Sequence, residues 1–132
     1  MKVELDHIGI AVSQLDESLK FFRDVLGLEI STCEEVPSQR VKAQFVSVGT
    51  ATLELLEATA DDSAIARFIK RKGPGLHHIT LRVENLSLVL NQLRDQGVQL
   101  IDEVPRPGAE GARVAFIHPS SAHGVLVELK EI

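Results

Sequence analysis

The sequence has little cysteine, no excess of basic charge and no long apolar run. Its one cysteine, Cys33, cannot close an internal disulfide, which predicts a reducing compartment, the cytoplasm. The net charge of -5 argues against a broad nucleic-acid-binding face. No apolar run approaches the roughly 18 residues of a membrane span, and the opening MKVELDHI lacks the apolar segment of a secretory signal. We therefore expect neither nucleic acid nor a membrane as a partner.

The sequence does contain enough apolar material for one hydrophobic core. Its 132 residues are fewer than one typical domain of about 150, so we expect a single domain, residues 1–132. Hydrophobic residues make up 44% and charged residues 25%, a balance that excludes disorder as the main state.

Internal similarity divides the chain into two halves. A histidine followed by isoleucine, a glycine after a helical pattern, and a glutamate in an apolar strand pattern each occur twice, 70 to 74 residues apart. These landmarks are Asp6-His7-Ile8 and His77-His78-Ile79, Gly27 and Gly97, and Glu54 and Glu128. Three landmarks at nearly one period predict two tandem modules.

Local patterns predict a β-α-β-β-β order in each module, and therefore an α+β fold with one mixed sheet. The modules cover about 1–60 and 76–132, with a linker helix at about 61–75. Asp16 is expected to cap the first helix, which runs to about Leu26 before Gly27. The other expected elements are strands at 41–48, 51–57, 77–83, 98–103, 112–118 and 124–130, a helix that Asp61-Asp62-Ser63 opens, and a helix at 86–96.

Side-chain alternation predicts where the polar strand residues point. His7 points away from Ile8 and Ile10, whose apolar face must cover the helix, and His78 shares the equivalent face of its strand. Glu54 and Glu128 lie in the middle of apolar strands, where an unpaired carboxylate is costly to bury. If the halves pair into one concave sheet, these four residues converge inside it.

Two imidazoles and two carboxylates suit one divalent metal ion. These residue types tolerate several ions; we favour cobalt, with nickel, manganese, zinc or magnesium as alternatives. A strand histidine or glutamate alone is more often structural, but the recurrence of both residues favours a metal site. Such an ion leaves coordination positions for a bidentate substrate and acts as a Lewis acid on a carbonyl oxygen.

The chain resembles the vicinal oxygen chelate superfamily and, within it, the methylmalonyl-CoA epimerases. The resemblance is carried by DHIGIAV at 6–12, ELLEAT at 54–59, DSAIARFIKRKGPGLHHI at 62–79 and DEVPRPGAEGARVAFIHPSSAHGVLVEL at 102–129. It implies paired βαβββ modules around a divalent metal, commonly a homodimer, and an isomerase that interconverts (2R)- and (2S)-methylmalonyl-CoA through a metal-stabilised enolate. The implied metal ligands are His7, Glu54, His78 and Glu128, in agreement with the side-chain alternation.

Three positions depart from that family. Some members have glutamine at the position of Glu54, some have a glutamate proposed as a base at the position of Ala43, and members often have lysine at the position of Ser120. Alanine cannot transfer a proton. We therefore expect Glu128 and Glu54 to be the two catalytic bases, each also a metal ligand.

Other assignments remain open from the sequence. The same four ligands occur in glyoxalase I, a lyase that acts on a glutathione hemithioacetal. A non-catalytic small-molecule-binding protein of the superfamily and a metal-free structural domain are further alternatives. Lys70-Arg71-Lys72 is expected to be a solvated helix end, with a phosphate contact as the minority interpretation. Candidate contacts to the acyl-CoA substrate are Gln39, Gln44, Arg113 and His118.

Overall fold

The computed structural model describes residues 1–132 as two compact units. The N-terminal unit is His7–His77, and the C-terminal unit is His78–Ile132 together with Met1–Asp6. The helices are α1 (Leu15–Leu19), α2 (Ala64–Lys72) and α3 (Leu86–Asp95). The strands are β1 (Glu4–Ala11), β2 (Glu29–Ile30), β3 (Glu34–Val36), β4 (Val41–Val48), β5 (Ala51–Ala58), β6 (Gly75–Val83), β7 (Arg106–Pro107), β8 (Arg113–Ile117) and β9 (Val127–Glu131). None of the helices has the length and apolar character that crossing a bilayer requires.

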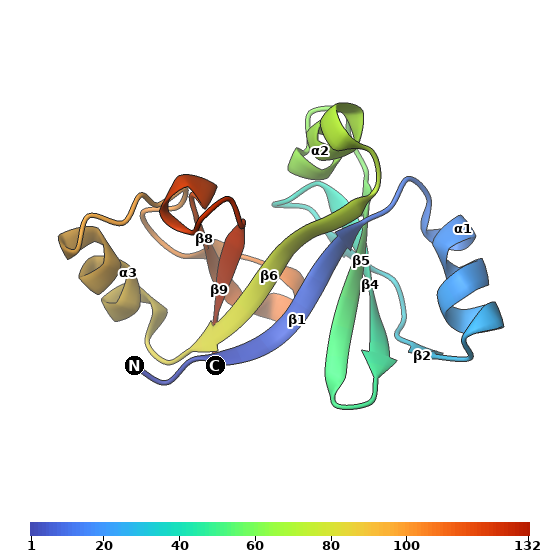
Figure 1. The fold of residues 1–132 in the computed structure, drawn as a ribbon, viewed down its shortest axis with the longest axis horizontal. Coiled ribbons are helices and arrows are strands. Elements are labelled where there is room, and N and C mark those ends of the chain that lie inside the picture. Colours follow the sequence, from blue (N-terminus) through green and yellow to red (C-terminus); the bar gives the residue numbers. More distant parts are fainter. The chain divides into compact units, whose positions relative to one another are not determined.

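The strands of the N-terminal unit lie in the order β2-β4-β5-β1, and β3 also pairs with β4. β1 and β5 are parallel, whereas β4 is antiparallel to each of its partners β2, β3 and β5. α1 lies beside β4 and β5 (Figure 1). The core under α1 contains Leu15 and Leu19 from the helix, Val46 from β4 and Leu55 from β5, with Ile10 of β1 packed against it. One face of β1 and β5 is thus covered by the helix, as the alternation of side chains predicts.

The start of α1 differs from the sequence prediction. The helix begins at Leu15, one residue before Asp16, and no side chain of its own N-terminal turn caps it. The Leu15 N–H instead donates to Oε1 of Glu57 on β5, at 2.7 Å. The prediction that Asp16 caps this helix was therefore wrong, because a carboxylate from a distant strand binds the exposed N–H group.

α1 continues into a π-helical segment, Lys20–Val25, before the chain turns. The Leu26 N–H donates to the carbonyl of Phe21, five residues earlier, at 3.0 Å, which is the hydrogen bond of a π-helix. Gly27 follows with a φ of 71°, the left-handed conformation predicted for it. α2 begins as predicted after Ser63, whose hydroxyl accepts the Ala66 N–H at 3.1 Å.

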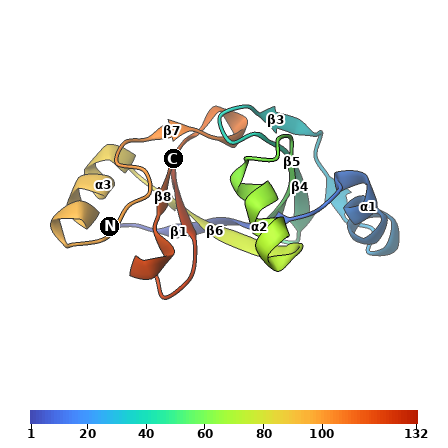
Figure 2. The same ribbon diagram turned by 90° about the horizontal axis from the view of Figure 1, so that it is seen from above.

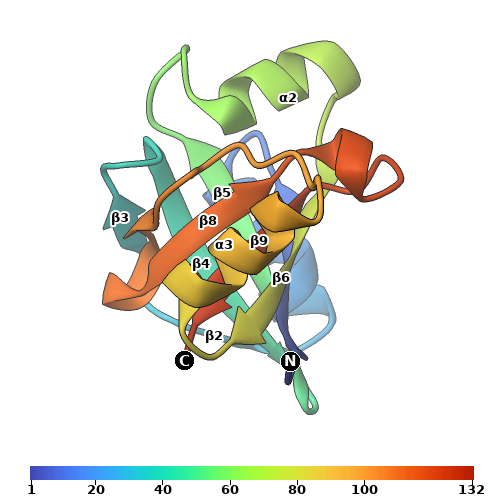
Figure 3. The same ribbon diagram turned by 90° about the vertical axis from the view of Figure 1, so that its left-hand side faces the viewer.

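The strands of the C-terminal unit lie in the order β6-β9-β8-β7. β6 and β9 are parallel, and β8 is antiparallel to β7 and β9. α3 lies across β8 and β9 (Figure 3). The apolar core beneath α3 contains Leu86, Val89 and Leu90 from the helix with Ala115 and Leu129 from the strands. This plan repeats that of the N-terminal unit.

The outer strand is interrupted in both units. In the N-terminal unit its pieces are β2 and β3, and both pair with β4. Figure 2 labels β3, one of these pieces. In the C-terminal unit its pieces are a single bridge from Leu100 to Ile117 and the short strand β7, both against β8. The predicted strand at 98–103 was therefore wrong in extent. The Asp102 carboxylate accepts the Phe116 N–H at 2.8 Å, so a side chain takes the place of a backbone partner in the ladder.

Candidate metal centre

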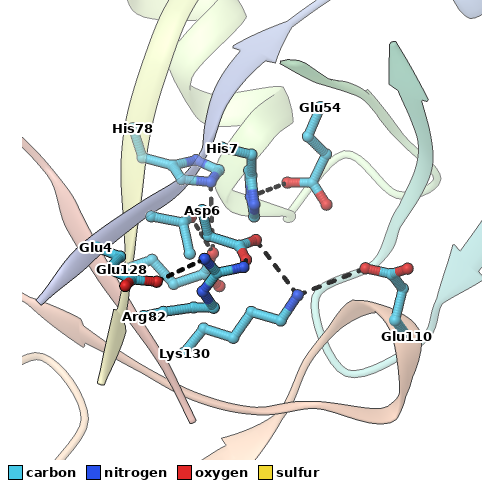
Figure 4. Close-up of polar contacts among 10 residues, drawn as sticks. Glu4, Asp6, His7, Glu54, His78, Arg82, Glu110, Glu128 and Lys130 are labelled. Atoms are coloured by element: carbon cyan, nitrogen blue, oxygen red, sulfur yellow. Dashed lines mark hydrogen bonds and ion pairs between the residues drawn. The ribbon is translucent and has the colours of Figure 1, made fainter. Parts of the chain in front are cut away.

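In the N-terminal unit, a histidine and a glutamate are buried side by side. His7 on β1 is 4% exposed and Glu54 on β5 is 5% exposed. The His7 Nε2 atom lies 3.1 Å from Oε1 of Glu54. Figure 4 marks this contact with a dashed line. The strand register brings them together, because Glu54 is opposite Gly9, which shares a face with His7.

In the C-terminal unit, the equivalent residues form a second buried pair. His78 is 7% exposed and Glu128 is 5% exposed. The His78 Nε2 atom lies 3.5 Å from Oε1 of Glu128. The hydroxyl of Thr80, which is fully buried, donates to the same carboxylate oxygen at 2.6 Å. This pair therefore differs from the first by a third, hydroxyl-bearing member.

A phenylalanine ring packs edge-on against each histidine. The His7 and Phe45 ring centroids are 5.6 Å apart, and those of His78 and Phe116 are 5.9 Å apart. Each phenylalanine is opposite the glutamate of its own pair in the strand register. Sequence reasoning missed these rings, although Phe45 and Phe116 are separated by the same 71 residues as the two histidines.

A network of charges continues from the second pair along β6 and β9. Thr80 is opposite Glu128 and Arg82 is opposite Lys130, so these side chains share one face. Arg82 donates to Asp6 at 3.3 Å and to Glu4 at 2.8 Å. Lys130 contacts Asp6 at 3.3 Å and Glu110 at 3.5 Å (Figure 4). The hydrogen bond from Arg82, followed by that from Lys2, lowers the pKa of Glu4 below its ordinary value.

The position at which some relatives have a glutamate is occupied by Ala43, which is fully buried. Ala43 is opposite Leu56 on β5, and so it shares a face with Phe45 and Glu54. The neighbouring Gln44 lies on the opposite face, where its side-chain amide donates to the Ser31 carbonyl at 3.0 Å. Gln44 thus does not take the place of the missing carboxylate.

The other candidate substrate contacts lie in different surroundings. The Nε2 atom of Gln39 is buried without a hydrogen-bond partner. Arg113 donates to Glu131 at 3.0 Å and to Ser87 at 3.3 Å, on the α3 side of β8. His118 uses its Nδ1 atom to accept the Ser120 N–H at 3.0 Å, which caps a short 3₁₀ turn. Arg113 and His118, both in the C-terminal unit, thus bind different partners.

His77 and Cys33, which are not among the candidate site residues, have ordinary surroundings. The His77 ring packs edge-on against Phe68 of α2, with centroids 5.0 Å apart. Cys33 is an exposed free thiol.

The chemistry of the two buried pairs fits a divalent ion. Each unit pairs one imidazole with one carboxylate: His7 with Glu54 in the N-terminal unit, and His78 with Glu128 in the C-terminal unit. Imidazole nitrogens suit transition metals, and two carboxylates balance a double positive charge. A buried carboxylate without a compensating charge is costly, so the donor set gains from a cation.

Comparison with known proteins identifies the family of this chain. A family model described as the glyoxalase/bleomycin resistance protein/dioxygenase superfamily matches residues 6–116. The chain belongs to this superfamily. The α+β fold with a mixed sheet, expected from the sequence, is confirmed for this member.

Relatives within the superfamily cover almost the whole chain. An uncharacterized protein of Bacillus subtilis, YqjC, is 47% identical over 127 residues, which is 96% of this chain and 91% of its own. The mitochondrial methylmalonyl-CoA epimerase of Bos taurus is 36% identical over 128 residues, 96% of this chain and 73% of its own. A solved structure, described as methylmalonyl-CoA epimerase in complex with methylmalonyl-CoA and NH4+, has a TM-score of 0.92 and 34% identity, and the match covers 99% of this chain and 95% of that one. The predicted resemblance is confirmed.

Proposed function

We propose that this protein is an isomerase that interconverts the (2R) and (2S) epimers of methylmalonyl-CoA with the help of one divalent metal ion per chain. The observation that carries the proposal is that a buried histidine and a buried glutamate form a pair at equivalent positions in each module. The relatives of the chain include a methylmalonyl-CoA epimerase whose match covers 96% of this chain. The proposed ligands of the ion are His7 and Glu54 from the N-terminal unit and His78 and Glu128 from the C-terminal unit.

The reaction requires removal of the C2 proton and its return on the opposite face. This proton lies between a thioester and a carboxylate, so its loss produces an enolate. A divalent ion held by these ligands supplies Lewis-acid stabilisation of the negative charge that develops on oxygen. The remaining task of the chain is to hold the substrate and to transfer one proton on each side of C2.

Glu54 and Glu128 are the proposed bases. Each carboxylate is buried, and each is held at one oxygen, by His7 in the first unit and by Thr80 in the second. A carboxylate fixed in this way can take a proton only from a substrate that is placed against it. One carboxylate from each module supplies the two faces that epimerisation needs, and Ala43 takes no part in proton transfer.

Gln39 and His118 are retained as proposed substrate contacts. The buried Gln39 amide nitrogen has N–H groups that no protein acceptor satisfies, and a substrate oxygen can accept them. Gln44 and Arg113 are also retained as proposed contacts, although each of them, like His118, already binds a structural partner.

The ion is proposed to be cobalt, with nickel, manganese, zinc or magnesium as the other ions that this donor set tolerates. A homodimer is expected from the superfamily. The cytoplasm is the proposed compartment, because the chain has one cysteine and uses no internal disulfide.

Hydrogen exchange at C2 tests the proposal. The protein is stripped with a chelator, reloaded with cobalt and incubated with methylmalonyl-CoA in heavy water, while mass spectrometry follows deuterium at C2. We expect rapid exchange only in the reloaded sample, against chelated and protein-free controls. No exchange above the controls would contradict the proposal and direct the same assay to the hemithioacetal of methylglyoxal and glutathione.

A further inference from the structure

A row of side chains leads from β7 to His78 in the C-terminal unit. The His78 ring packs edge-on against Phe116 on β8, with ring centroids 5.9 Å apart. The guanidinium carbon of Arg106 on β7 lies 5.2 Å from the centroid of the same phenylalanine ring. The strand register explains this row, because Arg106 is opposite Val114, which shares a face with Phe116 two residues later. Phe116 is therefore in contact with both a proposed metal ligand and a cation.

We infer that Arg106 is a positioning residue for His78: it fixes the Phe116 ring, which in turn fixes the orientation of the imidazole. The inference rests on the proposed function, in which His78 binds the metal ion. Residues that orient a metal ligand without touching the ion typically change metal affinity about 10–100-fold when they are replaced. Phe116 is 8% exposed and His78 is 7% exposed. The attraction between a cation and an aromatic ring is stronger where water is excluded in this way.

One carboxylate holds both members of the Arg106–Phe116 contact. Oδ2 of Asp102 accepts the Phe116 N–H at 2.8 Å and lies 3.5 Å from Nε of Arg106. That Nε atom is buried and makes no hydrogen bond, so the ion pair and the ring hold this end of the guanidinium. Asp102 also offsets the positive charge of Arg106, which opposes the binding of a divalent ion nearby.

The two modules differ at this position. The equivalent of Arg106 in the first module is Glu34, 72 residues earlier, which is opposite Ala43 on β4. A cation at this position is thus a feature of the second module alone. The histidine of that module also lies farther from its glutamate, at 3.5 Å for His78 and Glu128 against 3.1 Å for the first pair. Arg106 therefore supports the imidazole that its own glutamate holds less closely.

Cobalt titration of the metal-free protein tests the inference, because the sign of the change separates two effects. Loss of a positive charge alone strengthens the binding of a cation, whereas loss of the support for His78 weakens it. Arg106→Met keeps the length of the side chain without its charge and is expected to weaken cobalt binding about tenfold. Arg106→Lys keeps the charge but not the planar group, and its affinity is expected to lie between those of Arg106→Met and the wild type.

Arg94 provides the matched control. It lies on α3 of the same unit and forms an exposed ion pair with Glu103, at 2.7 Å. Arg94→Met makes the same charge change away from the row of side chains and is expected to change cobalt affinity less than about twofold.

A double-mutant cycle determines whether Arg106 acts through the phenylalanine ring. Phe116→Leu is expected to weaken cobalt binding, and the addition of Arg106→Met is expected to change the affinity less than about twofold further. Fully additive effects of the two substitutions would overturn the inference.

Nuclear magnetic resonance of the imidazole protons in metal-free protein provides a measurement that needs neither the ion nor a substrate. Arg106→Met is expected to shift the His78 signals and to leave those of His7 unchanged. Unchanged His78 signals, together with wild-type or tighter cobalt affinity, would overturn the inference. If C2 exchange is rapid while Arg106→Met behaves like Arg94→Met, only the inference fails. If cobalt affinity and the His78 signals depend on Arg106 but no exchange occurs, the inference stands and the proposed function fails.

Discussion

The His–Glu pairs of the two modules are alike in position but different in their hydrogen bonds. In the N-terminal unit, His7 itself contacts the carboxylate of Glu54 at 3.1 Å. In the C-terminal unit, the Thr80 hydroxyl donates to Glu128 at 2.6 Å, and His78 lies farther away, at 3.5 Å. The position equivalent to Thr80 in the first module is Gly9, which has no side chain to donate.

The comparison shows which features the repetition keeps and which it changes. Both modules keep the histidine, the glutamate, the edge-on phenylalanine and a glutamate three residues later that binds the N-terminus of the helix. The residue two positions after the histidine changes from Gly9 to Thr80. The histidine and glutamate are thus repeated, while the two carboxylates are placed in unequal surroundings. If the two carboxylates are the bases on opposite faces of one carbon, their different hydrogen bonds make the two proton-transfer groups unequal.

The largest expected effect comes from replacing each glutamate with glutamine. Glu54→Gln and Glu128→Gln are each expected to slow epimerisation about 10²–10⁴-fold, because the amide cannot act as a base. Each variant is expected to retain deuterium exchange with one epimer and to lose it with the other, and the two variants should differ in which epimer they spare. Mass spectrometry of the separate epimers measures this.

Metal content is the control for that comparison, because both glutamates are also proposed ligands. A glutamine oxygen can still bind an ion, so the cobalt content of each variant is to be measured before kinetics. A Glu54→Gln variant with full metal and full epimerase rate would remove Glu54 from the mechanism and leave Glu128 as the single base.

A smaller effect is expected from replacing Thr80, the residue whose hydroxyl distinguishes the second His–Glu pair from the first. Thr80→Val keeps the side-chain shape but removes the donor to a buried carboxylate, which should lower the free energy of unfolding by about 1–3 kcal/mol. Thr80→Ser keeps the hydroxyl and is the matched control. Urea denaturation of metal-free protein measures both. Equal stability of the valine variant and the wild type would show that this hydrogen bond does not hold Glu128.

The smallest effects are expected at the helix-binding glutamates. Glu57→Ala and Glu131→Ala should each lower the free energy of unfolding by about 1 kcal/mol, since each carboxylate accepts the first N–H of its helix. Glu131→Ala should cost slightly more, because Glu131 also binds Arg113, an exposed pair worth less than about 1 kcal/mol. Arg113→Ala isolates that second contribution. A Glu57→Ala variant as stable as the wild type would indicate that water caps α1 equally well.

The alternation of apolar residues was sufficient to predict the faces of β1 and β6, because one face of each strand must cover a helix. It therefore identified His7 and His78 as distinct from their neighbours, and both are buried as expected. The internal repeat identified Glu54 and Glu128, because each follows the histidine of its own module at a similar spacing. These predictions depend only on local pattern and on the similarity of the halves.

Contacts between distant parts of the chain could not be predicted in this way. The cap of α1 comes from Glu57, 42 residues after Leu15, so local capping preferences pointed to Asp16 instead. The Thr80 hydroxyl finds its partner 48 residues later, in Glu128. The outer strand near 98–103 is broken because the Asp102 side chain competes with the backbone for Phe116.

Cobalt titration of the metal-free protein tests the central claim most directly, that the two pairs bind one ion. The absorption of bound cobalt, followed to saturation, is expected to show one ion per chain. His7→Ala and His78→Ala, one from each module, are each expected to remove this same ion, and both variants should also lose C2 exchange. Two ions per wild-type chain, with one retained in each variant, would contradict the account and show two separate sites.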